Sequence, residues 1–136
     1  MGIAAIQAAV ATDTAEKGIL EFQISQVDSR RMMLTKKSGM VAENRSAVLT
    51  EWSSYDQRKK NGGEVTEYED SVWGNFSWDE FVGEYEIQVK EIEYQDKALE
   101  LERDNLQTKL TAVTTRLESE EKQLNQNIEK ELNYIK

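Results

Sequence analysis

Apolar residues recur at seven-residue steps along the N-terminal part of the chain. This first series is interrupted only by Asp13, and it comprises Ile6, Leu20, Val27, Leu34, Val41, Val48 and Tyr55. A second series runs from Ile3 to Trp52 and is mostly polar in its middle. Together they form a heptad seam, which predicts a long helix supercoiled around a partner helix. The partner could be the C-terminal helix of the same chain or a helix of another molecule.

The first helix is expected to occupy residues 1–60. Residues 58–63 (RKKNGG) place three cations at the negative end of the helix dipole, followed by residues that tolerate a positive φ. Gly39, after Lys36 and Lys37, is a weaker stop signal. We expect the helix to continue through Gly39, because the seam keeps its register there; the alternative is a helix that ends at Gly39.

Residues 61–77 form an acidic, aromatic connector, and a second long helix is expected over residues 78–136. Ser77 and Glu80 form a capping box, and Phe76 and Phe81 flank it as a hydrophobic staple. An apolar stripe with recurring steps of eleven follows, which suits a nearly straight helix; it comprises Phe81, Tyr85, Val89, Ile92, Leu99, Leu106, Leu110, Val113, Leu117, Leu124, Ile128, Leu132 and Ile135. The chain is thus expected to be a single all-α domain, an antiparallel coiled-coil hairpin.

Composition excludes several kinds of chemistry. The chain has no cysteine and no histidine, so it has no thiolate nucleophile, no Cys/His zinc site and no imidazole base. The net charge is −9, and residues 61–87 hold eight acids and no base. Nucleic-acid binding is disfavoured, because it needs a concentrated basic face. No catalytic residue and no cofactor are expected.

The acids of residues 64–86 could bind calcium or magnesium through oxygen. However, they lack the acidic ladder, central glycine and terminal glutamate of an EF-hand loop. The preferred interpretation is a solvated acidic surface, and the alternative is a docking face for a basic partner. No metal site is expected.

Two clusters have alternative interpretations. Eight of the eleven aromatic residues lie between Trp52 and Tyr85, as a small core, as an interface hot spot, or as a platform for a carbohydrate or cofactor. Arg30, Arg31, Lys36 and Lys37 form a solvated basic face, or they meet the acidic connector of a neighbouring molecule in a head-to-tail assembly.

Residues 1–12 carry no charged side chain. They lack the basic segment of a signal peptide and are too short to span a bilayer. We expect a protein without a transmembrane segment that is cytoplasmic, or exported without a cleaved signal peptide.

Residues 18–35 (GILEFQISQVDSRRMMLT) resemble small uncharacterised helical proteins of non-photosynthetic relatives of cyanobacteria. Those proteins also pair an apolar-Glu-Phe/Leu-Gln run with an Arg-Met or Arg-x-Leu run. The resemblance implies a helical, coiled-coil architecture and no known activity. In architecture the chain is also similar to the helical, cysteine-poor components of secretion machines and filaments.

These observations predict a structural protein and not an enzyme. The leading hypothesis is a self-assembling coiled-coil subunit of an oligomer or filament. The alternative is an adaptor or chaperone-like module that binds another protein through its connector. The partner would be a second copy or another helical protein. The expected interface residues are Leu20, Val27, Leu34, Val41, Val48, Trp52, Trp73, Phe76, Trp78, Phe81, Leu106, Leu110, Val113, Leu117 and Leu124.

Overall fold

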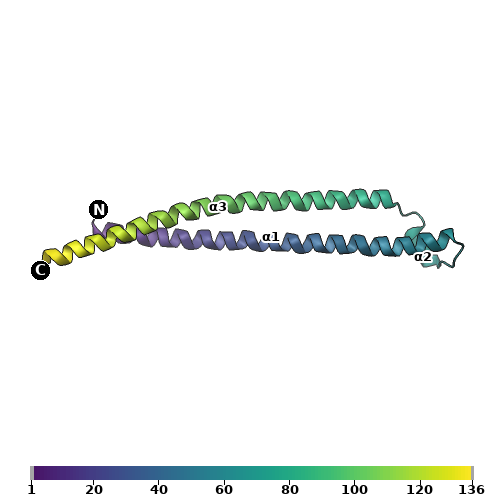
Figure 1. The fold of residues 1–136 in the computed structure, drawn as a ribbon, viewed down its shortest axis with the longest axis horizontal. Helices are drawn as coiled ribbons and strands as arrows, with labels where there is room; N and C mark the ends of the chain where they lie inside the picture. The colour runs from purple at the N-terminus through teal and green to yellow at the C-terminus, as the bar shows by residue number, and fades with distance from the viewer. Residues whose placement is uncertain (1, 136) are drawn as a thin grey trace. The chain divides into compact units, whose positions relative to one another are not determined.

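A computed structural model describes residues 2–135, and these residues form three helices and no strand. The helices are α1 (Ile3–Lys60), α2 (Glu67–Trp73) and α3 (Trp78–Ile135). The long helices α1 and α3 pack against each other as an antiparallel hairpin, and α2 lies within the connector between them (Figure 1). The all-α hairpin predicted from the sequence is confirmed.

Helix α1 runs without a break through both of its glycines. A Cβ atom added at Gly18 or Gly39 would have no neighbour within 4 Å, so neither glycine is required by close packing. The expected continuity at Gly39 is confirmed. The seam explains it, because apolar residues on both sides of Gly39 favour the same helix.

The end of α1 is a Schellman motif. Gly62 has a φ of 72°, and it is the residue in the left-handed region. The N–H of Gly63 donates to the carbonyl of Arg58 at 2.7 Å, and the N–H of Gly62 donates to that of Lys59 at 3.5 Å. The boundary predicted from the Asn-Gly-Gly run therefore has a defined backbone geometry.

Helix α2 was not predicted from the hydrophobic pattern, because seven residues are too few to show a period. Its N-terminus is a capping box. The Thr66 hydroxyl accepts from the N–H of Glu69 at 3.1 Å, and the Glu69 carboxylate accepts from the N–H of Thr66 at 3.3 Å. The Thr-x-x-Glu spacing could have indicated this helix.

The start of α3 agrees with the sequence in its N-cap and its staple, but the predicted capping box is only half formed, because among the described residues the Glu80 carboxylate accepts no hydrogen bond from the N–H of Ser77. The Ser77 hydroxyl accepts from the N–H of Glu80 at 3.3 Å, so Ser77 is the N-cap. The rings of Phe76 and Phe81 lie 5.8 Å apart between centroids, as the hydrophobic staple requires.

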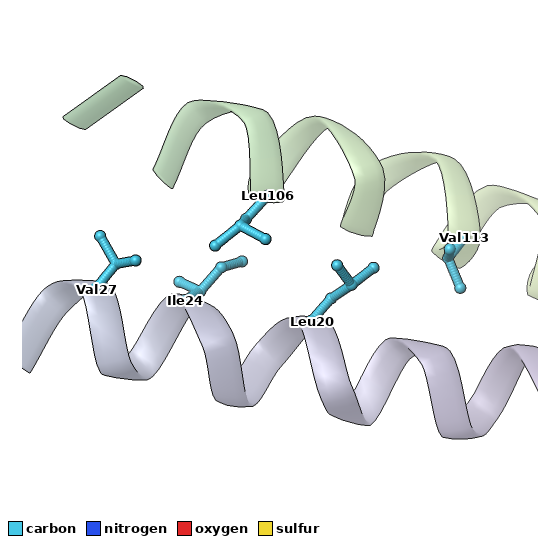
Figure 2. Packing of buried hydrophobic residues seen from close by; sticks show 5 residues of the cluster. All are labelled: Leu20, Ile24, Val27, Leu106 and Val113. Atoms are coloured by element: carbon cyan, nitrogen blue, oxygen red, sulfur yellow. The ribbon is translucent and has the colours of Figure 1, made fainter. Parts of the chain in front are cut away.

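The chain divides into two compact units, and both α1 and α3 contribute to each. We call Met1–Arg30 with Ala98–Lys136 the terminal unit, and Arg31–Lys97 the connector unit. In the terminal unit, side chains of α1 and α3 interdigitate to form a core (Figure 2). Its buried members are Leu20, Ile24, Val27, Leu106 and Val113, and Leu99 and Leu110 pack against them.

The apolar stripe of α3 does not stay buried to its end. Ile128, Leu132 and Ile135 were expected to continue the packed face, but they are 38%, 57% and 80% exposed. Within the terminal unit, the last turns of α3 run past Ile3, the first residue of α1, so α1 does not cover them (Figure 1).

Candidate interaction surfaces

The residues predicted to form an interface are buried or half-buried within the hairpin. Leu20, Val27, Leu106, Val113 and Leu117 are buried. The remaining ten are half-buried: Leu34, Val41, Val48, Trp52, Trp73, Phe76, Trp78, Phe81, Leu110 and Leu124. The surfaces left for a second molecule are therefore mainly other faces of α1, α2 and α3.

The polar residue that interrupts the first series, Asp13, is paired across the hairpin. It is only 6% exposed, and both of its carboxylate oxygens accept from the Arg116 guanidinium, at 2.9 and 3.0 Å. Arg116 also reaches Glu16 at 3.1 Å. The bonds from Arg116, and a further one shared with Glu120, hold the pKa of Asp13 below its ordinary value.

Glu120 completes this cluster. As a carboxylate its Oε2 atom is buried and has no hydrogen-bond donor. A proton on Glu120 would allow it to donate to Asp13, and this hydrogen bond together with burial raises the pKa of Glu120. The pKa of Asp13 is thus lowered and the pKa of Glu120 is raised from its ordinary value.

Two polar residues of the second series, Arg31 and Arg45, also have partners on α3. In the connector unit, Arg31 binds both oxygens of Asp96, at 2.9 and 3.2 Å, and lowers the pKa of that carboxyl. The Arg45 guanidinium lies 5.7 Å from the ring centroid of Trp78 and 5.3 Å from that of Tyr85, at cation–π distance. Asp13, Arg31 and Arg45 thus interrupt the heptad seam with specific cross-helix contacts, whereas Lys17 pairs with Glu21 of α1 itself.

Five of the eight aromatic residues between Trp52 and Tyr85 form one connected cluster, and Tyr68 lies outside it at 76% exposure. The rings of Trp52 and Trp78 stack at 5.5 Å, and Trp73 meets Phe76 edge-on at 5.0 Å. Phe81 contacts both Phe76 and Trp78. The cluster packs the end of α2 and the connector against α1 and α3, which agrees with a small core.

Helix α2 is held to the end of α1 by charged groups. The Tyr55 hydroxyl donates to Asp70 at 2.6 Å, Lys59 binds the same carboxylate at 2.8 Å, and Arg58 pairs with Glu69. These bonds lower the pKa of Asp70, chiefly through Lys59, and that of Glu69, chiefly through Arg58. Glu69 and Asp70, two acidic residues of the connector, are therefore already paired within the chain.

Large apolar side chains remain exposed on all three helices. Among the described residues, fifteen large hydrophobic residues are exposed, whereas nine hydrophobic residues are buried. The exposed set includes Ile19, Phe22, Met32, Met33, Met40, Tyr68, Val72, Ile87, Tyr94 and Leu101. Apart from the half-buried apolar residues, the described part of the hairpin thus leaves more large apolar residues exposed than buried.

Other kinds of site were sought over residues 2–135. No group of three or more acidic side chains gathers in this part of the chain so as to hold a metal ion. Nor is any described helix long and apolar enough to cross a membrane. Comparison with known proteins finds no matching family model, and neither a curated protein nor a solved structure of significant similarity.

Proposed function

We propose that this protein is a structural, self-assembling coiled-coil subunit whose helices pack against those of other copies in an oligomer or filament. The observation that carries the proposal is the excess of exposed over buried large apolar residues. Two long helices bury only one stripe each, and the remaining apolar surface favours association with further helices.

The cross-helix pairs support the same proposal. Asp13–Arg116 and Arg103–Asp28 in the terminal unit, and Arg31–Asp96 in the connector unit, each match one position of α1 to one of α3. Such pairs define the register of long helices. When the register of the hairpin is defined, the residues on its outer faces have fixed positions along the two helices. A regular assembly needs such fixed positions.

The test is the solution mass of the purified protein over a concentration series, measured by light scattering after size exclusion. We expect a defined oligomer, or a mass that grows with concentration. A monomer at every concentration would contradict self-assembly.

A second candidate is an adaptor or chaperone-like module that holds another protein through the connector. The observation that favours it is Tyr68, which is 76% exposed amid acidic residues. An adaptor stays monomeric until its partner is present, so the same mass measurement separates the two candidates. We infer no catalytic role, since the most buried carboxylate, Asp13, is engaged by Arg116.

A further inference from the structure

One side of α1 in the connector unit carries exposed methionines and unpaired lysines. Met32, Met33 and Met40 are 62%, 67% and 69% exposed, and Lys36 and Lys37 are exposed without an ion-pair partner among the described residues. At 100° per residue these five side chains fall within an arc of about 140°, on the side of α1 away from the seam. We call them the methionine–lysine patch. Methionine is adaptable and recurs at binding surfaces.

The basic character of this patch is not cancelled by neighbours on its own helix. No acidic residue occurs between Asp28 and Glu43. Arg31, which belongs to the same basic cluster in the sequence, points instead to Asp96. Within the connector unit, the charged groups of this cluster that remain available to a second molecule are therefore Lys36 and Lys37, and Arg30, in the terminal unit, is also exposed.

The connector carries a patch of opposite charge. Tyr68 and Val72 are 76% and 43% exposed and lie one turn apart on one face of α2, and the exposed Glu67 precedes Tyr68 in the sequence. Glu64 lies just before α2. Glu64 and Glu67 have no ion-pair partner among the described residues, whereas Glu69 and Asp70 are taken by Arg58 and Lys59. We call Glu64, Glu67, Tyr68 and Val72 the tyrosine–glutamate patch.

The two patches cannot meet within one molecule. Asp70 of α2 is hydrogen-bonded to Tyr55, and about 27 Å of helix separates Lys37 from Tyr55 at 1.5 Å per residue. No lysine side chain spans that length. A contact between the patches needs a second copy of the chain.

We propose that copies of this protein join head to tail, with the methionine–lysine patch of one molecule seated on the tyrosine–glutamate patch of the next. The inference rests on the self-assembly proposed above and names its surfaces. Each patch has apolar anchors and two unpaired charges of one sign, so the two are complementary in both respects. The occupant of each patch is therefore a second copy.

The geometry of such a contact decides the kind of assembly. Because the two patches are different surfaces of the chain, a single contact between two molecules leaves the pair with one free patch of each kind. Assembly then continues into an open chain unless the rotation between copies closes a ring. The smallest closed form is a two-fold pair, in which the methionine–lysine patch of each molecule contacts the tyrosine–glutamate patch of the other.

Two charge-reversal variants test the proposal. Lys36→Glu with Lys37→Glu gives a molecule with two acidic patches, and Glu64→Lys with Glu67→Lys gives one with two basic patches. Each variant alone should need a concentration about tenfold or more above wild type to assemble. An equimolar mixture should assemble as an alternating copolymer. The fourfold variant, which exchanges the charges within one chain, should assemble alone.

The matched control is Lys109→Glu with Lys130→Glu. It makes the same change in net charge as the Lys36/Lys37 variant, at two exposed lysines of α3 in the terminal unit, and should assemble like wild type. All variants are measured by light scattering, with helicity followed by circular dichroism to confirm that they fold.

The outcomes separate this inference from the proposed function. If wild type assembles and the Lys36/Lys37 variant does so equally well, the patches are wrong and self-assembly stands. The same follows if neither the mixture nor the fourfold variant regains assembly. If wild type stays monomeric at every concentration, both proposals fail.

Discussion

Glu120 is a partly buried residue of the terminal unit that lacks a hydrogen-bond donor when it is ionised. Its carboxyl faces Asp13 and Arg116, and its pKa is raised above 4.5 by the hydrogen bond to Asp13 and by burial. A group with a raised folded pKa stabilises the fold below its unfolded pKa, and that contribution is lost as pH rises through the folded pKa. Glu120 therefore weakens the hairpin at neutral pH.

We predict that Glu120→Gln raises Tm at pH 7 and flattens the rise in Tm that wild type should show between neutral pH and about 4.5. The glutamine amide can donate to Asp13 at every pH. Asp13 acts in the opposite sense, because its lowered pKa stabilises the fold above 3.8 and this is lost at lower pH. Thermal melts by circular dichroism from pH 3 to 8 measure both effects. Glu121→Gln, at an exposed neighbouring position, is the control, and equal pH profiles for the two variants would contradict the role of Glu120.

Two glycines respond oppositely to the same substitution. Gly39 is helical with open space around its Cβ position, so Gly39→Ala should stabilise the protein by about 0.5–1 kcal/mol. Gly62 has a φ of 72°, so Gly62→Ala introduces strain and should destabilise it by about 1 kcal/mol. Urea unfolding gives both values. A stabilising Gly62→Ala would show that the Schellman motif does not constrain this turn.

At the scale of single residues, the sequence predicted burial better than pairing. Val27 and Val113 are each 2% exposed, as their positions in the two stripes indicated. By contrast, the partners of Asp13 and Arg31 could not be read from the sequence. Which α3 residue faces each of them depends on the register of the hairpin, and periodicity within one helix carries no information about register.

The packed face of α1 gives a direct test at the scale of the helix. Leu20 is 6% exposed within the core of the terminal unit, and its neighbour Ile19 is 59% exposed. Leu20→Ala should cost about 2–4 kcal/mol through lost burial and a residual cavity. Ile19→Ala should cost about 0.5 kcal/mol or less in the isolated hairpin.

Chemical denaturation at a protein concentration below any assembly transition measures both losses. The comparison keeps the helix and the change of volume nearly constant, so only the side of α1 differs. Equal losses would mean that Ile19 is also buried in solution.

A helix was easier to predict from the sequence where more sequence signals indicated the same helix. The start of α3 had a cap, a staple and a stripe, and all three lie where they were expected. Helix α2 had only the Thr66–Glu69 capping box, and it is held in place by Arg58 and Lys59 of α1. That stabilisation is tertiary, so no local pattern could have shown its strength.

For the whole molecule, the sequence left open whether the seam of α1 pairs with α3 or with another chain. In the structure the seam of α1 packs against α3 of the same chain, so the seam residues are already engaged within the hairpin. What the molecule offers to others is its outer apolar surface, on which Ile87, Tyr94 and Leu101 of α3 are 67%, 77% and 66% exposed. Assembly should therefore depend on outer faces and leave the hairpin intact.

Asp13 is the position where the specificity of the whole hairpin can be tested. A leucine at this position would complete the seven-residue series from Ile6 to Leu20, and it would remove the partner that Arg116 binds across the seam. Arg116 is itself about half exposed and can turn to water or to Glu16. A polar residue in an apolar seam fixes register and oligomer state at a cost in stability, because misaligned pairings leave it buried without its partner.

We therefore predict that Asp13→Leu keeps full helicity and melts at or above the wild-type temperature, yet yields a broader set of species than wild type. The added apolar residue stabilises any pairing of the seam, including shifted hairpins and pairing between chains. Thr12→Leu, which adds the same side chain at an exposed position, should leave the distribution of species closer to that of wild type. Light scattering after size exclusion measures the distribution, and circular dichroism measures the melt. A single species identical to wild type, or a large loss of Tm, would show that Asp13 stabilises the hairpin without selecting its register.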